Sequence, residues 1–159
     1  MKRSIQLIWC VAVLASIRST EVAAHELQVG HCCVAVYGTL RRGGVNACLL
    51  AGSTFLGTDV TRDILLYDLG EYPGARIEPS AGIEIEVYRI DSETLSALDK
   101  LEEFEPADPA RSLYVRQQLP TVFGPAWVYL YQGSVAGRQT IKTGRWPVTP
   151  AHRASECSS

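Results

Sequence analysis

The strongest constraint on the fold is a strand signal that runs directly into a helix signal. Residues 83–90 read Ile-Glu-Ile-Glu-Val-Tyr-Arg-Ile, an almost perfect alternation of apolar and polar side chains. This alternation is typical of a half-buried β-strand. Asp91 follows as a candidate N-cap, and the leucines after it fall at three-residue steps on one helix face (Leu95, Leu98 and Leu101). The pattern therefore predicts a strand followed at once by a helix.

Shorter apolar runs elsewhere predict further strands, bounded by Gly, Pro and polar residues, at 32–37, 54–58, 64–67, 114–119 and 126–131. A short helix is predicted over 47–51, with Asn46 as its N-cap. Residues 71–74 are predicted to form a turn, and residues 103–113 a loop, because Pro, Gly and charged residues gather there. Many strands with two short helices indicate an α+β fold with a mostly antiparallel sheet, which can close into a barrel.

Length and charge exclude two broad classes of function. The chain has 159 residues, 47% of them hydrophobic, which fits one globular domain. Its 15 basic and 17 acidic residues give a formal net charge of −2. No basic excess is available to neutralise several phosphates, and no basic run marks a membrane-surface patch. We expect no nucleic-acid partner and no stable membrane association; the oligomeric state does not follow from the sequence.

The two ends of the chain are predicted to lie outside the domain. Residues 1–24 carry the parts of a secretory signal: two basic residues, an apolar run and a small-residue cleavage motif. Charged residues just before that motif argue against a signal. We expect residues 1–30 to be a signal-like or disordered extension, residues 31–147 to form the domain, and residues 148–159 to be a loose tail.

The five cysteines match no known metal motif. Their spacing contains no CxxC pair, and no pair of histidines accompanies them (Cys10, Cys32, Cys33, Cys48 and Cys157). His31 lies beside two of them, but one histidine and two neighbouring cysteines cannot complete a tetrahedral site. We expect small apolar residues in a reduced protein and no metal.

A glycine-rich loop follows the first predicted strand. Residues 36–46 read Val-Tyr-Gly-Thr-Leu-Arg-Arg-Gly-Gly-Val-Asn. Bare backbone N–H groups in such a bend can hold an anion, here a carboxylate rather than a phosphate, because no GxxxxGK[ST] or GxGxxG motif is present. A tight turn at a strand end is the simpler explanation of this loop taken alone. Arg41 and Arg42 within it are expected to be solvated.

Acidic residues gather at the end of the predicted helix. Glu102, Glu103 and Glu105 lie where the negative end of the helix dipole disfavours carboxylates. Such acids are sometimes catalytic, although a solvated helix face is the commoner explanation. Shortly afterwards Tyr114 and Arg116 open a strand. Tyr114 either shapes a pocket or is a core aromatic residue, and Arg116 is expected to pair with a nearby acid.

In this order and spacing, the segments resemble the γ-glutamylcyclotransferase-like superfamily, and especially its small bacterial branch. The resemblance covers about residues 33–147. The residues that carry it are Tyr37-Gly38-Thr39-Leu40 with Asn46, Tyr72-Pro73-Gly74-Ala75, Glu86 to Asp91, Leu98-Asp99-x-x-Glu102, Tyr114-x-Arg116 and Ala126 to Tyr131.

The resemblance implies a mixed, mostly antiparallel β-barrel with a few short helices. It also implies an enzyme of acyltransferase or lyase type, without metal or other cofactor. Such an enzyme cyclises the glutamyl group of a small γ-glutamyl compound to 5-oxoproline and releases an amine or amino acid. A glutamate acts as acid and base, which carries over to Glu102, with Glu103 or Glu105 as alternatives. The loop amides hold the glutamyl end, which gives as substrate-binding residues Tyr37, Gly38, Thr39, Leu40 and, on the later strand, Tyr114.

The alternative is a non-catalytic small-molecule binding module that retains the γ-glutamyl pocket. Some bacterial relatives lack the glutamate, so its presence favours an enzyme. The resemblance implies a cytoplasmic protein, or an exported one if residues 1–24 are a cleaved signal. The group attached to the γ-glutamyl unit stays open: amino acids, amines, glutathione-like peptides and carrier-bound intermediates all fit.

Overall fold

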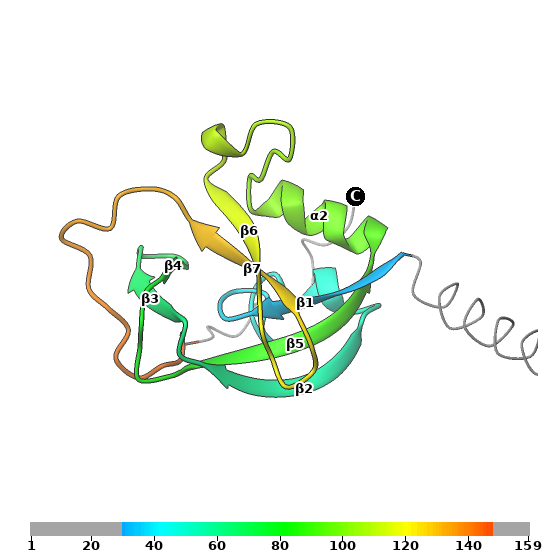
Figure 1. Cartoon of the computed structure of the whole chain (residues 1–159), viewed down its shortest axis with the longest axis horizontal. Coiled ribbons are helices and arrows are strands. Elements are labelled where there is room, and N and C mark those ends of the chain that lie inside the picture. Colours follow the sequence, from blue (N-terminus) through cyan, green and yellow to red (C-terminus); the bar gives the residue numbers. More distant parts are fainter. Residues whose placement is uncertain (1–29, 148–159) are drawn as a thin grey trace, which may run out of the picture. The chain divides into compact units, whose positions relative to one another are not determined.

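A computed structural model describes residues 30–147 (Figure 1). Residues 1–29 of the predicted extension, and the predicted tail, lie outside the described residues. In chain order the elements are β1 (His31–Val36), the 3₁₀ helix η1 (Ala47–Leu50), β2 (Thr54–Thr61), β3 (Ile64–Asp68), β4 (Pro73–Ile77), β5 (Ile83–Asp91), α2 (Ser92–Leu101), the 3₁₀ helix η2 (Pro109–Arg111), β6 (Tyr114–Leu119) and β7 (Ala126–Tyr131).

The described strands form two sheets. Five strands pair in the order β2-β5-β1-β7-β6, and β3 pairs with β4 in a separate hairpin. The β1–β7 pair is parallel, with Val34 opposite Trp127, while β2–β5, β6–β7 and β3–β4 are antiparallel. The predicted α+β class with a mixed sheet and few short helices is therefore confirmed.

The predicted barrel is not found. Within residues 30–147 no strand pairing joins the two edge strands, β2 and β6. The turn between β6 and β7 does reach β2, because the backbone N–H of Val122 donates to the Asp59 carboxylate at 2.9 Å. That contact does not close the sheet, since a single hydrogen bond to a side chain is not a ladder of backbone pairs.

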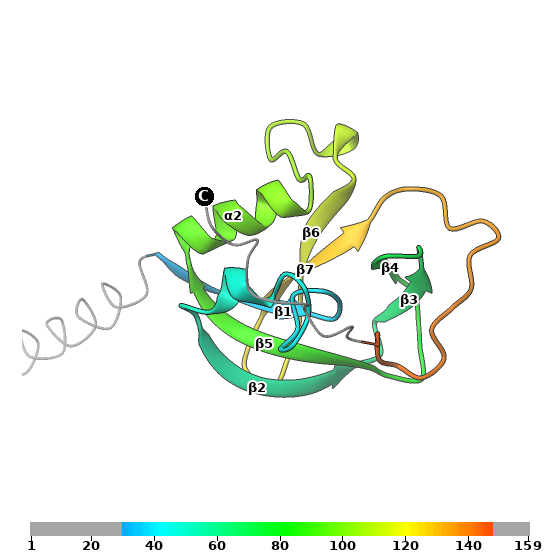
Figure 2. The same cartoon turned by 180° about the vertical axis from the view of Figure 1, so that it is seen from behind.

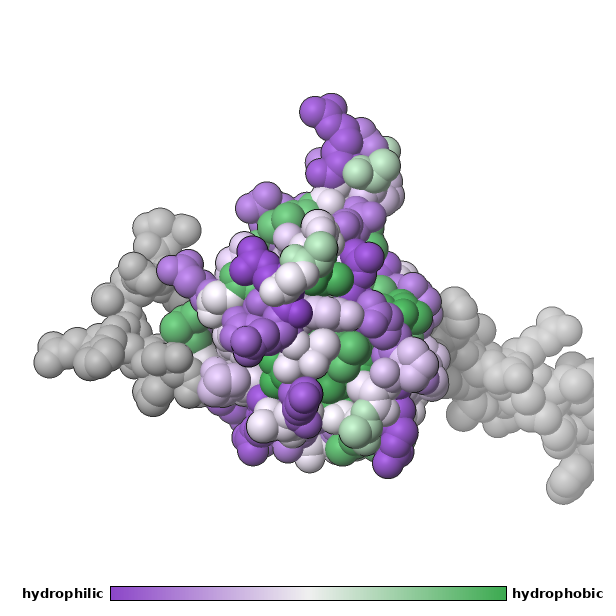
Figure 3. Space-filling model, turned by 90° about the vertical axis from the view of Figure 1, so that its left-hand side faces the viewer, coloured by the Kyte–Doolittle hydropathy of each residue, from purple (hydrophilic) through white to green (hydrophobic). Residues whose placement is uncertain are grey.

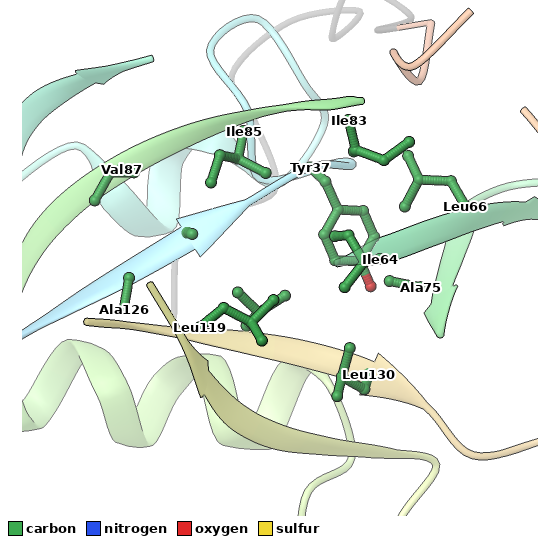
Figure 4. Close-up of a cluster of buried hydrophobic side chains, with 12 residues drawn as sticks. Tyr37, Ile64, Leu66, Ala75, Ile83, Ile85, Val87, Leu119, Ala126 and Leu130 are labelled. Carbon is green, nitrogen blue, oxygen red and sulfur yellow. The ribbon is translucent and has the colours of Figure 1, made fainter. Parts of the chain in front are cut away.

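The five-stranded sheet is covered on both faces, as the alternation of side chains along β1 requires. Ala35 and Tyr37 belong to the core shared with the β3–β4 hairpin and β5, which also contains Ile64, Leu66, Ala75, Ile83, Ile85 and Val87 (Figure 4). Val34 and Val36 belong to the core on the other face, which also contains Leu98 of α2, Tyr88 and Tyr129. Seen from behind, η1 and the loop that follows β1 lie next to α2 (Figure 2).

The predicted N-cap of the main helix is confirmed, because the Asp91 carboxylate accepts the backbone N–H of Thr94 at 2.8 Å. The predicted cap at Asn46 is wrong. The element after it is a 3₁₀ helix without a side-chain cap, and the Asn46 amide instead donates to the Thr39 hydroxyl at 3.1 Å. The turn predicted over residues 71–74 is wrong in its second half, because strand β4 begins at Pro73. This strand was not predicted, since Pro73 and Gly74 are typical of turns.

One face of the described residues has a surface of mixed hydropathy. On the face in Figure 3, hydrophobic residues form small separate areas among hydrophilic ones. No helix among residues 30–147 is long and apolar enough to cross a membrane.

Candidate active site

A cavity of about 300 Å³ lies at the end of β1. Its walls come from the loop after β1, the turn before β4, the end of α2, and strands β6 and β7. All of the predicted site residues line it: Tyr37, Gly38, Thr39, Leu40, Glu102 and Tyr114. The fold therefore brings three distant segments of the sequence to one hollow of the size that small-molecule sites have.

The loop after β1 is held by its own backbone hydrogen bonds. The N–H of Arg41 donates to the carbonyl of Gly38 at 3.1 Å, and the N–H of Asn46 donates to the carbonyl of Thr39 at 3.1 Å. By contrast, the N–H groups of Gly38, Thr39 and Leu40 have no acceptor within residues 30–147. Consecutive amide donors that line a cavity without partners suit a carboxylate or a developing oxyanion.

Gly44 is required where the loop folds back on itself. A Cβ atom there would overlap the carbonyl oxygen of Thr39 and lie 2.9 Å from that of Arg41. We expect Gly44→Ala to lower the free energy of unfolding by about 1–3 kcal/mol, measured by urea denaturation, because backbone atoms must move to admit the methyl group. Gly52→Ala is the matched control, since Gly52 has open space around it. Equal stabilities of the two variants would contradict this role of Gly44.

Side chains from β5 support the same loop. The buried Glu86 carboxylate accepts the backbone N–H of Arg42 at 2.9 Å and the hydroxyl of Tyr88 at 2.8 Å. Burial raises the pKa of Glu86, but these hydrogen bonds outweigh it, so the pKa lies below its ordinary value. The Arg41 guanidinium donates to Glu84 at 2.6 Å and to the carbonyl of Trp146 at 3.2 Å.

The expectation that both loop arginines are solvated is wrong for Arg41, which is only 1% exposed. The alternating pattern had marked Glu84 and Glu86 as the polar face of a half-buried strand. In the structure the loop after β1 packs on that face, and the sequence alone indicated no role for either glutamate. The signal for it was present, because two arginines in the loop match two acids at alternate positions of one strand.

Glu102 is the C-cap residue of α2 and lines the cavity. The helix ends in a Schellman motif: the N–H of Glu103 donates to the carbonyl of Lys100 at 3.3 Å, and the N–H of Phe104 to that of Asp99 at 2.8 Å. The Glu102 carboxylate has no hydrogen bond or ion pair with any described residue. Burial raises its pKa to about 7, so this group can exchange a proton near neutral pH.

Two tyrosine hydroxyls lie near the Glu102 carboxylate. Tyr37 donates to the carbonyl of Tyr129 at 2.7 Å, and Tyr114 donates to the carbonyl of Pro73 at 3.1 Å. Burial, and after it the charge of Glu102, raises the pKa of both hydroxyls, so both stay protonated. Because the Tyr114 proton is directed to Pro73, the tyrosine oxygen is left as an acceptor.

The acids at the end of α2 occupy different places. Glu102 and Glu103 line the cavity. Glu105 does not, and its carboxylate accepts the backbone N–H of Ala107 at 3.2 Å on the exposed side of the loop. Arg116 pairs with Asp99, as expected of a structural partner for a nearby acid.

The cysteines match the expectation only in part. Cys32 and Cys33 are free, but Cys48 is disulfide-bonded, so a fully reduced chain was a wrong expectation. Cys10 and Cys157 lie outside the described residues. No group of three or more His, Cys, Asp or Glu side chains within residues 30–147 is arranged to hold a metal ion.

Amides without an acceptor among the described residues and one carboxylate of near-neutral pKa line the same small cavity, an arrangement that suits acid–base chemistry on a small molecule. Residues 34–148 match the family "Gamma-glutamyl cyclotransferase, AIG2-like". The chain belongs to this family of γ-glutamylcyclotransferase-type enzymes, which confirms the resemblance seen in its sequence.

Individual relatives agree with this assignment. A protein from Vibrio cholerae is 41% identical over 114 residues, which are 71% of this chain and 93% of the relative. The solution NMR structure of YtfP from Escherichia coli superposes with a TM-score of 0.58 at 37% identity, over 72% of this chain and 95% of YtfP. The γ-L-glutamyl-butirosin B γ-glutamyl cyclotransferase of Niallia circulans is 33% identical over 103 residues, 60% of this chain and 64% of that protein.

Proposed function

We propose that the protein cyclises the glutamyl group of a small γ-glutamyl compound to 5-oxoproline and releases the attached amine. The observation that carries the proposal is the Glu102 carboxylate, without a hydrogen-bonding partner among the described residues and with a pKa of about 7. It lines the same cavity as Gly38, Thr39 and Leu40, whose amides have no acceptor within residues 30–147. A proton carrier and a set of oxyanion donors are the two things this reaction needs.

The first step is removal of a proton from the substrate's α-ammonium group, which cannot attack while protonated. Glu102 accepts that proton as general base, and the Tyr114 oxygen accepts a second N–H and orients the amine. The free amine then attacks the γ-carbonyl carbon, and a new C–N bond closes the five-membered ring. Because both groups belong to one molecule, correct orientation supplies an effective concentration of about 10⁵–10⁸ M.

The second step is release of the amine. The carbonyl oxygen carries the negative charge of the tetrahedral intermediate and accepts hydrogen bonds from the loop amides. The protonated Glu102 then gives its proton to the leaving nitrogen, the original C–N bond breaks and the carbonyl re-forms. The restored carboxylate accepts the extra proton of the new ring nitrogen and passes it to solvent. The products are 5-oxoproline and the free amine, and these steps require no metal or redox cofactor.

The alternative function, a non-catalytic binding module, is less well supported. A binding site gains nothing from a buried carboxylate without a partner, because burying such a group is unfavourable. A cytoplasmic site of action stays a prediction from the family resemblance.

The charge of the cavity favours one class of γ-glutamyl compound. Within residues 30–147 the charged residues that line the cavity are acidic (Glu71, Glu102 and Glu103), and no described Lys, Arg or His lines it. Val45, Tyr72 and Leu101 add exposed apolar side chains to the lining. A leaving group with its own carboxylate would be repelled here, so we propose γ-glutamyl amines as the preferred substrates over γ-glutamyl amino acids.

The test compares two substrates that differ by one carboxylate, γ-glutamyl-n-butylamine and γ-glutamyl-norvaline, with 5-oxoproline release as the readout. We expect kcat/KM to be about tenfold higher for the butylamine compound at low salt, with a smaller ratio in the Glu71→Gln variant. Equal rates would contradict the charge preference but not cyclisation. Binding of both compounds without any 5-oxoproline would favour the binding module.

A further inference from the structure

We propose that Asp99 and Arg116 are positioning residues that hold the Glu102 carboxylate in the cavity. The inference deepens the proposed function, since it concerns the same acid–base group. Neither residue lines the cavity, so neither is expected to touch the substrate. Their role is argued from the contacts they make on both sides of Glu102 in the chain.

The first contact precedes Glu102. Arg116 Nη1 of β6 lies 3.1 Å from Asp99 Oδ2, and both side chains are largely buried. The other oxygen, Asp99 Oδ1, accepts the hydroxyl of Tyr129 of β7 at 2.6 Å. The Asp99 carboxylate therefore joins α2 to β6 and β7. In Figure 1 the C-terminal end of α2 lies beside β6. Because Asp99 lies three residues before Glu102, it fixes the helix turn from which Glu102 projects.

The second contact follows Glu102. The guanidinium carbon of Arg116 lies 5.2 Å from the centre of the Phe104 ring and 5.0 Å from that of Trp127, within the range of cation–π attraction. The backbone N–H of Phe104 also donates to the carbonyl of Asp99 at 2.8 Å. One guanidinium thus holds the chain three residues before Glu102 and two residues after it.

The end of α2 has two unfavourable features that these contacts offset. Glu103 adopts a φ of 51°, the left-handed conformation that favours glycine and disfavours other residues by about 1–2 kcal/mol. Glu102 itself has no bond to a described residue that would keep its carboxylate out of water. Since an ionised carboxylate is more stable in water, a looser helix end would let Glu102 turn outward.

The same set of contacts extends to the loop after β1. The carbonyl of Tyr129 accepts the hydroxyl of Tyr37, the residue that begins the Tyr-Gly-Thr-Leu segment. The titratable groups near Glu102 on other elements are the hydroxyls of Tyr37, Tyr114 and Tyr129, and Glu71 lines the same cavity. The tyrosines stay protonated because burial raises the pKa of each, so they do not titrate with Glu102.

The experiment measures the pH dependence of kcat in the Arg116→Gln and Arg116→Lys variants of the full chain. We expect Arg116→Gln to lower kcat about 10–100-fold with KM within threefold. It should also move the apparent pKa of the acidic limb in the pH profile of kcat from about 7 toward the ordinary glutamate value of 4.5. Arg116→Lys keeps the charge beside Asp99 but not the planar stacking, so it should restore part of kcat. Arg89→Gln is the control, since Arg89 is an exposed arginine of β5.

An unchanged kcat and an unchanged acidic limb in Arg116→Gln would overturn the proposal. If that variant does not fold, Tyr129→Phe removes only the hydroxyl bonded to Asp99 and should move the limb in the same direction by a smaller amount; no movement would overturn the proposal. Carboxyl ¹³C NMR of Glu102 separates this inference from the proposed function. A lower Glu102 pKa in the variants supports positioning even if wild type releases no 5-oxoproline, and an unchanged pKa opposes it.

Discussion

Glu102→Gln is expected to abolish 5-oxoproline release while the protein still binds γ-glutamyl compounds. Glutamine keeps the size of the side chain and its contacts at the end of α2, but it cannot accept a proton from the substrate or return one. We expect kcat to fall about 10²–10⁴-fold, with the dissociation constant changed less than threefold. The measurements are product release by chromatography and binding by calorimetry.

The neighbouring acids provide matched controls for this substitution. Glu105→Gln should leave kcat unchanged, because Glu105 does not line the cavity. Glu103→Gln tests the other carboxylate that the end of α2 brings to the cavity. Loss of turnover in Glu103→Gln, together with normal turnover in Glu102→Gln, would show that Glu103 is the acid–base residue instead of Glu102.

The same Glu102→Gln variant is expected to be more stable than wild type above pH 7. Burial raises the pKa of Glu102 to about 7 from an ordinary value of 4.5, so the folded protein binds this proton more tightly than the unfolded chain does. Wild type therefore loses stability as the pH rises from 4.5 to 7, by up to about 3 kcal/mol. Glutamine does not ionise and avoids this loss.

Urea denaturation of both proteins at pH 4 and pH 8 measures the effect. We expect a difference of up to about 3 kcal/mol in favour of the variant at pH 8, and almost none at pH 4, where Glu102 is protonated in both states. All other titrating groups are shared and cancel in the comparison. A variant that is less stable than wild type at pH 8 would show that the carboxylate is not buried unfavourably.

Local sequence patterns predicted those helices and strands whose conformation is determined by neighbouring residues in the sequence. The alternation in β5 and the Asp91 cap of α2 depend on such neighbours, and both were predicted correctly. Strand β4 was missed because its conformation depends on β3, which pairs Ile64 with Ile77 and Asp68 with Pro73. Local patterns also could not predict whether the sheet closes, since closure depends on whether the distant edge strands β2 and β6 pair.

The site was predicted through family resemblance rather than through any local signal. Nothing near Tyr37 in the sequence indicates that Glu102 and Tyr114 line the same cavity. The alternating pattern assigned Glu86 to a polar face, but the loop after β1 covers that face and buries the carboxylate. For Arg116 the sequence predicted a structural acid partner, and only the docking of α2 on β6 identified Asp99 as that acid.

The pH dependence of kcat/KM for 5-oxoproline release from γ-glutamyl-n-butylamine tests the central claim most directly. If Glu102 is the general base, kcat/KM should rise about tenfold per pH unit up to pH 7 and then level off. The limb should be absent from any residual activity of Glu102→Gln. A wild-type profile that is flat between pH 5 and pH 8, or that keeps its limb in the variant, would contradict the role assigned to Glu102.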